Sequence, residues 1–272
     1  MGELQWRHPP VEGVSMANAP DLTGDLKTLK VLYLRERNLR RRLQCELIKR
    51  TDPDAPTAQL GYMPLQAHRH PAPKGTIVVF ASLAGGDDID RLEFFGSLRD
   101  LPANRVFVVD FYQIWYQNGL IGLTADRRET IEFLTRYLDG FERPFTFLGS
   151  SSGAYAALLY GHALRADRIL SFSAQTNITP KVWNRYGRFR ADDMHFVRDD
   201  PFNDLKPLFE ATPLAGQAHL YFGRRNVVDF RQNTRMEGLS NVTLMPQDLG
   251  QHNIARRLKN LGQLDTIIAD IT

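Results

Sequence analysis

Three consecutive serines between two glycines are the residues of this chain with the clearest chemical potential. The stretch Gly149-Ser-Ser151-Ser-Gly153 has the form G-x-S-x-G, and only Ser151 has glycine at both the −2 and the +2 position. An apolar run, Phe145 to Leu148, precedes it, and an Ala/Leu-rich run with helical character follows it. A strand that turns into a helix within so few residues exposes its middle residue and requires small neighbours. We therefore predict that Ser151 is a nucleophile at the carboxyl end of a strand.

A serine hydroxyl needs a base to accept its proton and an acid to orient that base. Among the seven histidines, His252 follows the last predicted strand, so it should reach the edge of the sheet where Ser151 is expected. Asp229 is the only carboxylate in the loop predicted after the strand at 217–222, and it is the preferred acid. Asp248, which is close to His252 in sequence, is the alternative acid. A surface role or a helix-capping role is the competing interpretation for each of these partners.

The elements that must position these residues alternate along the chain. Strands are predicted at 76–80, 105–110, 145–148, 168–172, 217–222 and 241–245. Helices are predicted at about 87–99, from Thr124 as N-cap to Leu138, directly after Gly153, and at about 253–261. Such alternation indicates an α/β fold, with a mostly parallel sheet that helices cover on both faces.

The remaining segments suggest how the chain is divided. Residues 1–24 are polar and rich in Pro and Gly, and we expect an N-terminal arm there, followed by a single domain at 25–272. Two strands, near 43–47 and 59–65, should form an antiparallel pair at a sheet edge. The long interval at 173–216 is expected to be a lid-like insertion or, alternatively, a structural cover over one end of the sheet.

From about residue 40 onward the chain resembles the α/β-hydrolase superfamily. The resemblance rests on the elbow Gly149-Ser-Ser151-Ser-Gly153, on the order Ser…Asp…His, and on Asp110 directly after a strand. It implies Ser151 as nucleophile, Asp229 as acid and His252 as base. It also implies an oxyanion hole made by the backbone N–H groups of Leu83 and Ser152. The implied fold is the α/β-hydrolase fold, and the implied activity is that of a serine esterase.

Two positions depart from the usual pattern of this superfamily. Asn226 stands where members with small substrates often have the acid, and Asp229 comes three residues later. Ala81-Ser82 stands where the oxyanion loop often begins His-Gly. The run at 149–175 is also loosely similar to uncharacterised hydrolases found with bacterial polysaccharide biosynthesis enzymes, which implies a small-molecule or glycan-linked acyl substrate.

Three functions are compatible with these residues. The first is a serine hydrolase that cleaves a carboxylic ester or thioester through an acyl-enzyme on Ser151, and it requires no cofactor or metal. The second is an acyltransferase that passes the acyl group to an alcohol, because water exclusion rather than the triad decides between these outcomes. The third is a non-catalytic binding protein on a hydrolase scaffold.

Composition limits the remaining classes of function. The chain has 272 residues, of which 43% are apolar and 24% charged, and a formal net charge of +3, too small to indicate a nucleic-acid partner. The single cysteine, Cys45, excludes an intrachain disulfide and a multi-cysteine metal site. No apolar run reaches the length of a membrane span, and the N-terminus lacks the apolar core of a signal peptide. We therefore expect a cytoplasmic protein; the sequence does not predict its oligomeric state.

Overall fold

The computed structural model describes residues 64–83, 92–185 and 199–270, in which seven strands form one sheet. The strands are β1 (Leu65–His68), β2 (Thr76–Phe80), β3 (Asn104–Val108), β4 (Phe145–Ser150), β5 (Arg168–Phe172), β6 (Gln217–Gly223) and β7 (Val242–Gln247). Their order across the sheet is β1-β3-β2-β4-β5-β6-β7. β1 pairs antiparallel with β3, and all other neighbouring pairs are parallel. β4, which leads to Ser151, therefore lies in the middle of the sheet.

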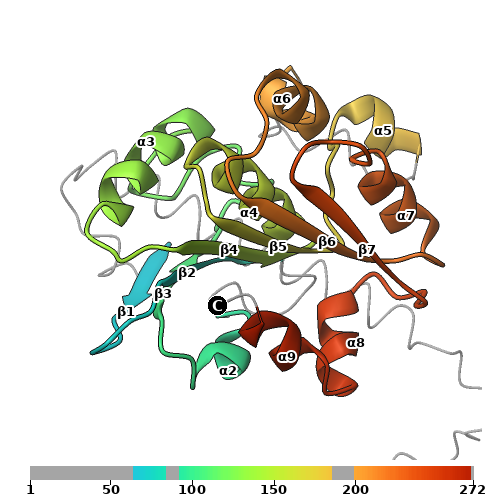
Figure 1. Cartoon of the computed structure of the whole chain (residues 1–272). Coiled ribbons are helices and arrows are strands. Elements are labelled where there is room, and N and C mark those ends of the chain that lie inside the picture. Colours follow the sequence, from blue (N-terminus) through green and yellow to red (C-terminus); the bar gives the residue numbers. More distant parts are fainter. Residues whose placement is uncertain (1–63, 84–91, 186–198, 271–272) are drawn as a thin grey trace, which may run out of the picture.

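Helices cover both faces of this sheet (Figure 1). One face carries α3 (Arg127–Leu138), α4 (Ser152–Ala163), α5 (Pro180–Arg185), α6 (Leu205–Ala211) and α7 (Val227–Thr234). The other face carries α2 (Phe95–Leu98), α8 (Ile254–Asn260) and α9 (Leu264–Ala269). Strand β2 contacts both layers, because Val78 and Phe80 point into one hydrophobic cluster, and Ile77 and Val79 into the other. This alternation explains why a parallel strand here is apolar along its whole length.

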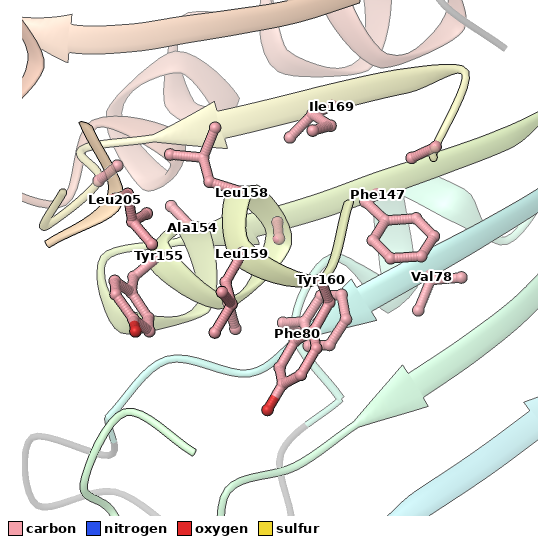
Figure 2. Packing of buried hydrophobic residues seen from close by; sticks show 14 of the residues in the cluster. Val78, Phe80, Phe147, Ala154, Tyr155, Leu158, Leu159, Tyr160, Ile169 and Leu205 are labelled. Carbon is pink, nitrogen blue, oxygen red and sulfur yellow. The ribbon is translucent and has the colours of Figure 1, made fainter. Parts of the chain in front are cut away.

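Among the helices of the described residues, α4 is the most deeply buried, and it follows directly on the turn at Ser151. Its residues from Ser152 to Gly161 are all buried, and an apolar surface on every side is what a helix inside a core requires. Figure 2 shows α4 packed against the central strands, with the ring of Tyr160 lying over that of Phe80. These two rings stack with their centroids 5.3 Å apart. This stacking holds the C-terminal half of α4 against the end of β2.

The six strands predicted between residues 76 and 245 are confirmed, and helix boundaries differ. The strands predicted at 76–80 and 168–172 match β2 and β5 residue for residue, and the other four differ by at most two residues at either end. Helix α3, however, begins at Arg127 with Asp126 as its N-cap, so the prediction of Thr124 as the cap was wrong. The hydroxyl of Thr124 instead accepts a hydrogen bond from the Leu120 N–H at 2.7 Å and closes the preceding turn.

The predicted antiparallel edge is only partly described. β1 is the antiparallel edge strand, but it starts at Leu65, where the predicted strand ends, and its partner is β3. The predicted strand at 43–47 and the arm at 1–24 lie outside the described residues.

The described parts of the 173–216 segment include α5, a 3-10 helix (Pro201–Asn203) and α6. The buried Arg127 of α3 anchors this segment through an ion pair with Asp200 at 2.7 Å. Its guanidinium also lies 5.0 Å from the ring centre of Tyr155 on α4, within the range of a cation–π contact. A lid function for the segment stays a prediction.

Candidate active site

The turn from β4 to α4 holds Ser151 in a backbone conformation that few residues adopt. Ser151 has φ 54° and ψ −118°, at the N-cap position of α4, and its N–H donates to the carbonyl oxygen of Phe172 at 2.8 Å. A Cβ on Gly149 would lie 2.2 Å from backbone atoms of Gly153, and a Cβ on Gly153 would clash with the backbone of Phe80, so both positions must stay glycine. Strain of this kind, stabilised by surrounding packing, is common where a side chain performs chemistry.

The hydroxyl of Ser151 makes no capping bond to its own helix and is directed to a histidine instead. Its Oγ lies 2.9 Å from Nε2 of His252, which is in the connection between β7 and α8. The other ring nitrogen, Nδ1, lies 2.7 Å from Oδ1 of Asp229. If Nδ1 carries the proton and donates it to Asp229, Nε2 is free to accept the proton of Ser151. The structure thus brings three of the predicted residues into one hydrogen-bonded row.

Asp229 lies in the first turn of α7, not in a loop as the sequence suggested. The side chain of Asn226 caps this helix by accepting from the N–H groups of Val228 and Asp229, both at 3.1 Å. Asn226, the residue at the superfamily's usual acid position, therefore orients the turn that carries the carboxylate. Asp229 is 1% exposed, and its Oδ2 has no hydrogen-bond partner within the described residues. The contact with His252 thus compensates part of the cost of burying this carboxylate.

Asp248, the alternative acid, is held by arginines instead of by His252. Its Oδ1 accepts from Nε of Arg224 at 2.9 Å and from Nε of Arg225 at 2.8 Å. These hydrogen bonds hold the pKa of the Asp248 carboxyl below its ordinary value of 3.8. Arg225 also donates to the carbonyl oxygen of Asp248 at 2.8 Å. This cluster, Arg224, Arg225 and Asp248, joins the loop before α7 to the loop before His252.

One predicted oxyanion donor, the Leu83 N–H, contacts the side chain of the residue that carries the other donor. The N–H of Leu83 donates to Oγ of Ser152 at 2.7 Å, so this predicted donor is engaged by the Ser152 side chain. The neighbouring N–H of Ser82 donates to the Glu93 carboxylate at 3.2 Å, and the Ser82 hydroxyl also bonds that carboxylate. Ser152 is the first residue of α4, where helical N–H groups have no partner within the helix. Its backbone N–H therefore remains suited to an oxyanion.

Asp110 organises the loop that supports these donors. Its carboxylate accepts the backbone N–H groups of Gln113, Ile114 and Tyr116, at 3.0, 2.9 and 2.9 Å. Burial raises the pKa of Asp110, and the backbone hydrogen bonds partly offset this. The Tyr116 hydroxyl lies 2.9 Å from the carbonyl oxygen of Ala81, the first residue of the Ala81–Leu83 segment. The sequence placed Asp110 after a strand, but it gave no sign of the Tyr116 contact.

The described part of the chain holds neither a cluster of metal-ligating side chains nor a membrane-spanning helix. Between residues 64 and 270, excluding 84–91 and 186–198, no three His, Cys, Asp or Glu side chains gather as metal ligands would. Within the same ranges no helix combines the length and the apolar character that a membrane crossing needs.

Comparisons with known proteins were made on sequence and on structure. No protein-family model matches the chain, and no curated protein matches it. Solved structures do match. The capsule O-acetyltransferase of Neisseria meningitidis serogroup A aligns with a TM-score of 0.52 and 15% identity, over 75% of this chain and 92% of that chain. A mutant of that enzyme in complex with CoA gives a TM-score of 0.53 and 14% identity, with the same coverage.

Two further structures have the same arrangement. MPT51 (FbpC1) of Mycobacterium tuberculosis aligns with a TM-score of 0.51 and 12% identity, over 75% of this chain and 91% of that chain. MenH from S. aureus aligns with a TM-score of 0.50 and 13% identity, over 77% and 97%. At such identities the likeness concerns the fold alone. Together with the mostly parallel sheet and the strand–serine–helix turn at its centre, it shows that the chain has the α/β-hydrolase fold.

Proposed function

We propose that the chain is a serine hydrolase that cleaves a carboxylic ester or thioester through an acyl-enzyme on Ser151. The observation that carries this proposal is the row of contacts from Ser151 Oγ to His252 Nε2 at 2.9 Å, and from His252 Nδ1 to Asp229 Oδ1 at 2.7 Å. A nucleophile, a base and an orienting acid at such distances are what acyl transfer at a serine requires.

In this reaction Ser151 Oγ attacks the carbonyl carbon of the substrate while its proton passes to His252 Nε2. The Asp229 carboxylate accepts the Nδ1–H and stabilises the imidazolium that forms. The carbonyl oxygen becomes an oxyanion near the start of α4, and its collapse expels an alcohol or thiol, which takes the proton from His252. Water then attacks the acyl-enzyme by the same route and regenerates Ser151.

An active-site-directed fluorophosphonate probe tests this proposal. We expect wild-type protein to be labelled on Ser151, and Ser151→Ala to lose both the label and the hydrolysis of p-nitrophenyl acetate. The matched control is Ser150→Ala, since Ser150 is the preceding residue, has the same side chain and makes no hydrogen bond to His252 among the described residues. Intact wild-type protein that takes no label would favour the binding-protein interpretation.

The second candidate is an acyltransferase that uses the same three residues. A capsule O-acetyltransferase has the same fold, and the 149–175 run is similar to hydrolases found with polysaccharide biosynthesis enzymes, so a glycan-linked acyl group is a reasonable substrate class. Adding oligosaccharide acceptors to the acyl-enzyme separates the two candidates. A hydrolase releases free acid at an unchanged rate, whereas a transferase forms acylated acceptor at the expense of free acid. The substrate class and the cytoplasmic location stay predictions.

A further inference from the structure

The hydroxyl of Ser152 accepts the backbone N–H of Leu83, the donor that the oxyanion loop was expected to supply. Ser152 Oγ accepts the Leu83 N–H at 2.7 Å, and the residue is 1% exposed. A hydroxyl has one proton to donate and can accept hydrogen bonds at the same time. Among the described residues, no acceptor takes the proton of the Ser152 hydroxyl. A buried O–H that accepts a strong hydrogen bond but donates none is poised to receive a partner.

The neighbouring donors of the loop are already engaged. The Ser82 N–H is directed to the Glu93 carboxylate, and the Leu83 N–H to Ser152. An oxyanion formed on Ser151 lies beside the backbone N–H of the next residue, Ser152, in a turn of this type. The side-chain hydroxyl of that same residue carries a proton that no described acceptor takes.

We propose that the oxyanion is held by two groups of Ser152, its backbone N–H and its side-chain hydroxyl, and that the Leu83 N–H acts through that hydroxyl. The inference rests on the proposed function, since it concerns the same acyl-transfer step. The bond from Leu83 fixes the rotation of the Ser152 hydroxyl and makes its proton more acidic, because hydrogen bonds in a chain polarise one another. Ser152 is thus a catalytic residue through its side chain, and Leu83 is a positioning residue.

The test is Ser152→Ala, which removes the hydroxyl and keeps the backbone N–H. Loss of one oxyanion donor typically lowers kcat about 100-fold to 1,000-fold. We expect a fall in kcat of about 100-fold for p-nitrophenyl acetate, with KM within about threefold of wild type, because the bond strengthens only as negative charge develops. The matched control is Ser150→Ala, which removes a hydroxyl on the other side of Ser151 and should leave kcat within about twofold.

Two more variants separate catalysis from folding. Ser152→Thr keeps a hydroxyl and should recover most of the activity, whereas Ser152→Cys keeps the size of the side chain but offers only a weak donor and should resemble Ser152→Ala. The thermal midpoint of each variant is measured in parallel. If Ser152→Ala does not fold, a folded Ser152→Cys must show the loss of kcat for the inference to hold.

The possible outcomes bear on the inference differently. If the wild-type protein is active and Ser152→Ala has the same kcat, the inference is overturned and the proposed function stands. A Ser152→Ala variant that is faster than wild type would also overturn it, since the hydroxyl would then be blocking the Leu83 N–H. A wild-type protein that neither hydrolyses the ester nor takes the fluorophosphonate label would overturn the proposed function, and the inference with it.

Discussion

Gly153 and Phe80 are in backbone contact: a Cβ on residue 153 would lie 2.1 Å from the Phe80 carbonyl oxygen. The first turn of α4 therefore rests directly on the end of β2. This contact brings the hydroxyl of Ser152 within reach of Leu83, just beyond that strand end, while α4 begins immediately after Ser151. One glycine thus sets the spacing between the nucleophile turn and the oxyanion loop.

We predict that Gly153→Ala impairs both stability and catalysis. The added methyl group must push α4 and β2 apart, and overpacking of this kind usually costs about 1–3 kcal/mol. Turnover should fall at least about 100-fold, because small misplacements of reacting groups have large effects. Urea unfolding and p-nitrophenyl acetate hydrolysis measure the two effects. The control is Gly96→Ala in α2, where an added Cβ meets nothing within 4 Å and should not destabilise the protein.

The second prediction concerns the acid. Asp229→Asn keeps the shape of the side chain but removes the charge that stabilises imidazolium, and it can favour the wrong tautomer of His252. In a serine-protease triad the equivalent change lowers turnover about ten-thousandfold, and we expect a loss of at least about 100-fold here. The thermal midpoint should change little. The matching Asp248→Asn variant should lose less than about tenfold, and the reverse ranking would show that Asp248 is the acid.

The pH profile of the Asp248→Asn variant independently checks that Asp248 is not the acid that orients His252. The arginines hold its folded-state pKa below 3.8, so its contribution to stability is present above that value and is lost as the pH falls below it. Between about pH 4.5 and 8 the cluster with Arg224 and Arg225 therefore keeps its charge. Within this window the pH profile of kcat/KM in Asp248→Asn should have the wild-type shape. A displaced acid limb in the variant would mean that Asp248 acts on His252 directly.

Asp110 should matter for stability more than its distance from Ser151 in the sequence suggests. In Asp110→Asn one carboxylate oxygen becomes an NH2 group, which cannot accept the backbone N–H groups that Asp110 now binds. Leaving such groups unpaired costs about 1–3 kcal/mol, measurable by urea unfolding. Asp126→Asn is the control, because Asn caps a helix about as well as Asp and should be nearly neutral. Equal effects of the two substitutions would contradict a structural role for Asp110.

The sequence predicted the parts of the fold that depend on local pattern. The run of residues in β2 is β-branched from Thr76 to Val79 and ends in Phe80, a composition typical of a strand buried on both faces. The glycines around Ser151 likewise reflect a steric need that can be recognised without coordinates. The order of Asp229 and His252 along the chain was enough to place both at the same edge of the sheet.

What the sequence did not predict depends on which of several possible hydrogen bonds or elements forms in the folded chain. Thr124 and Asp126 are both good capping residues, and the Leu120 N–H, not local preference, engaged the hydroxyl of Thr124. The bond from Leu83 to Ser152 joins positions 69 residues apart, so no periodicity indicates it. Helix α7 is only eight residues long, too short for a clear apolar pattern, although Asn226 was a visible start signal.

The position of β7 affects how the candidate active site comes apart when the protein unfolds. In the described part of the chain β7 is an outer strand that pairs only with β6, and His252 follows it by a few residues. Outer strands open in local fluctuations at lower free energy than central ones. The base and the nucleophile thus belong to regions that unfold at different free energies. Under mild denaturant, amide exchange should reach β7 before the central strands, and the site should come apart while the central sheet around β4 is still folded.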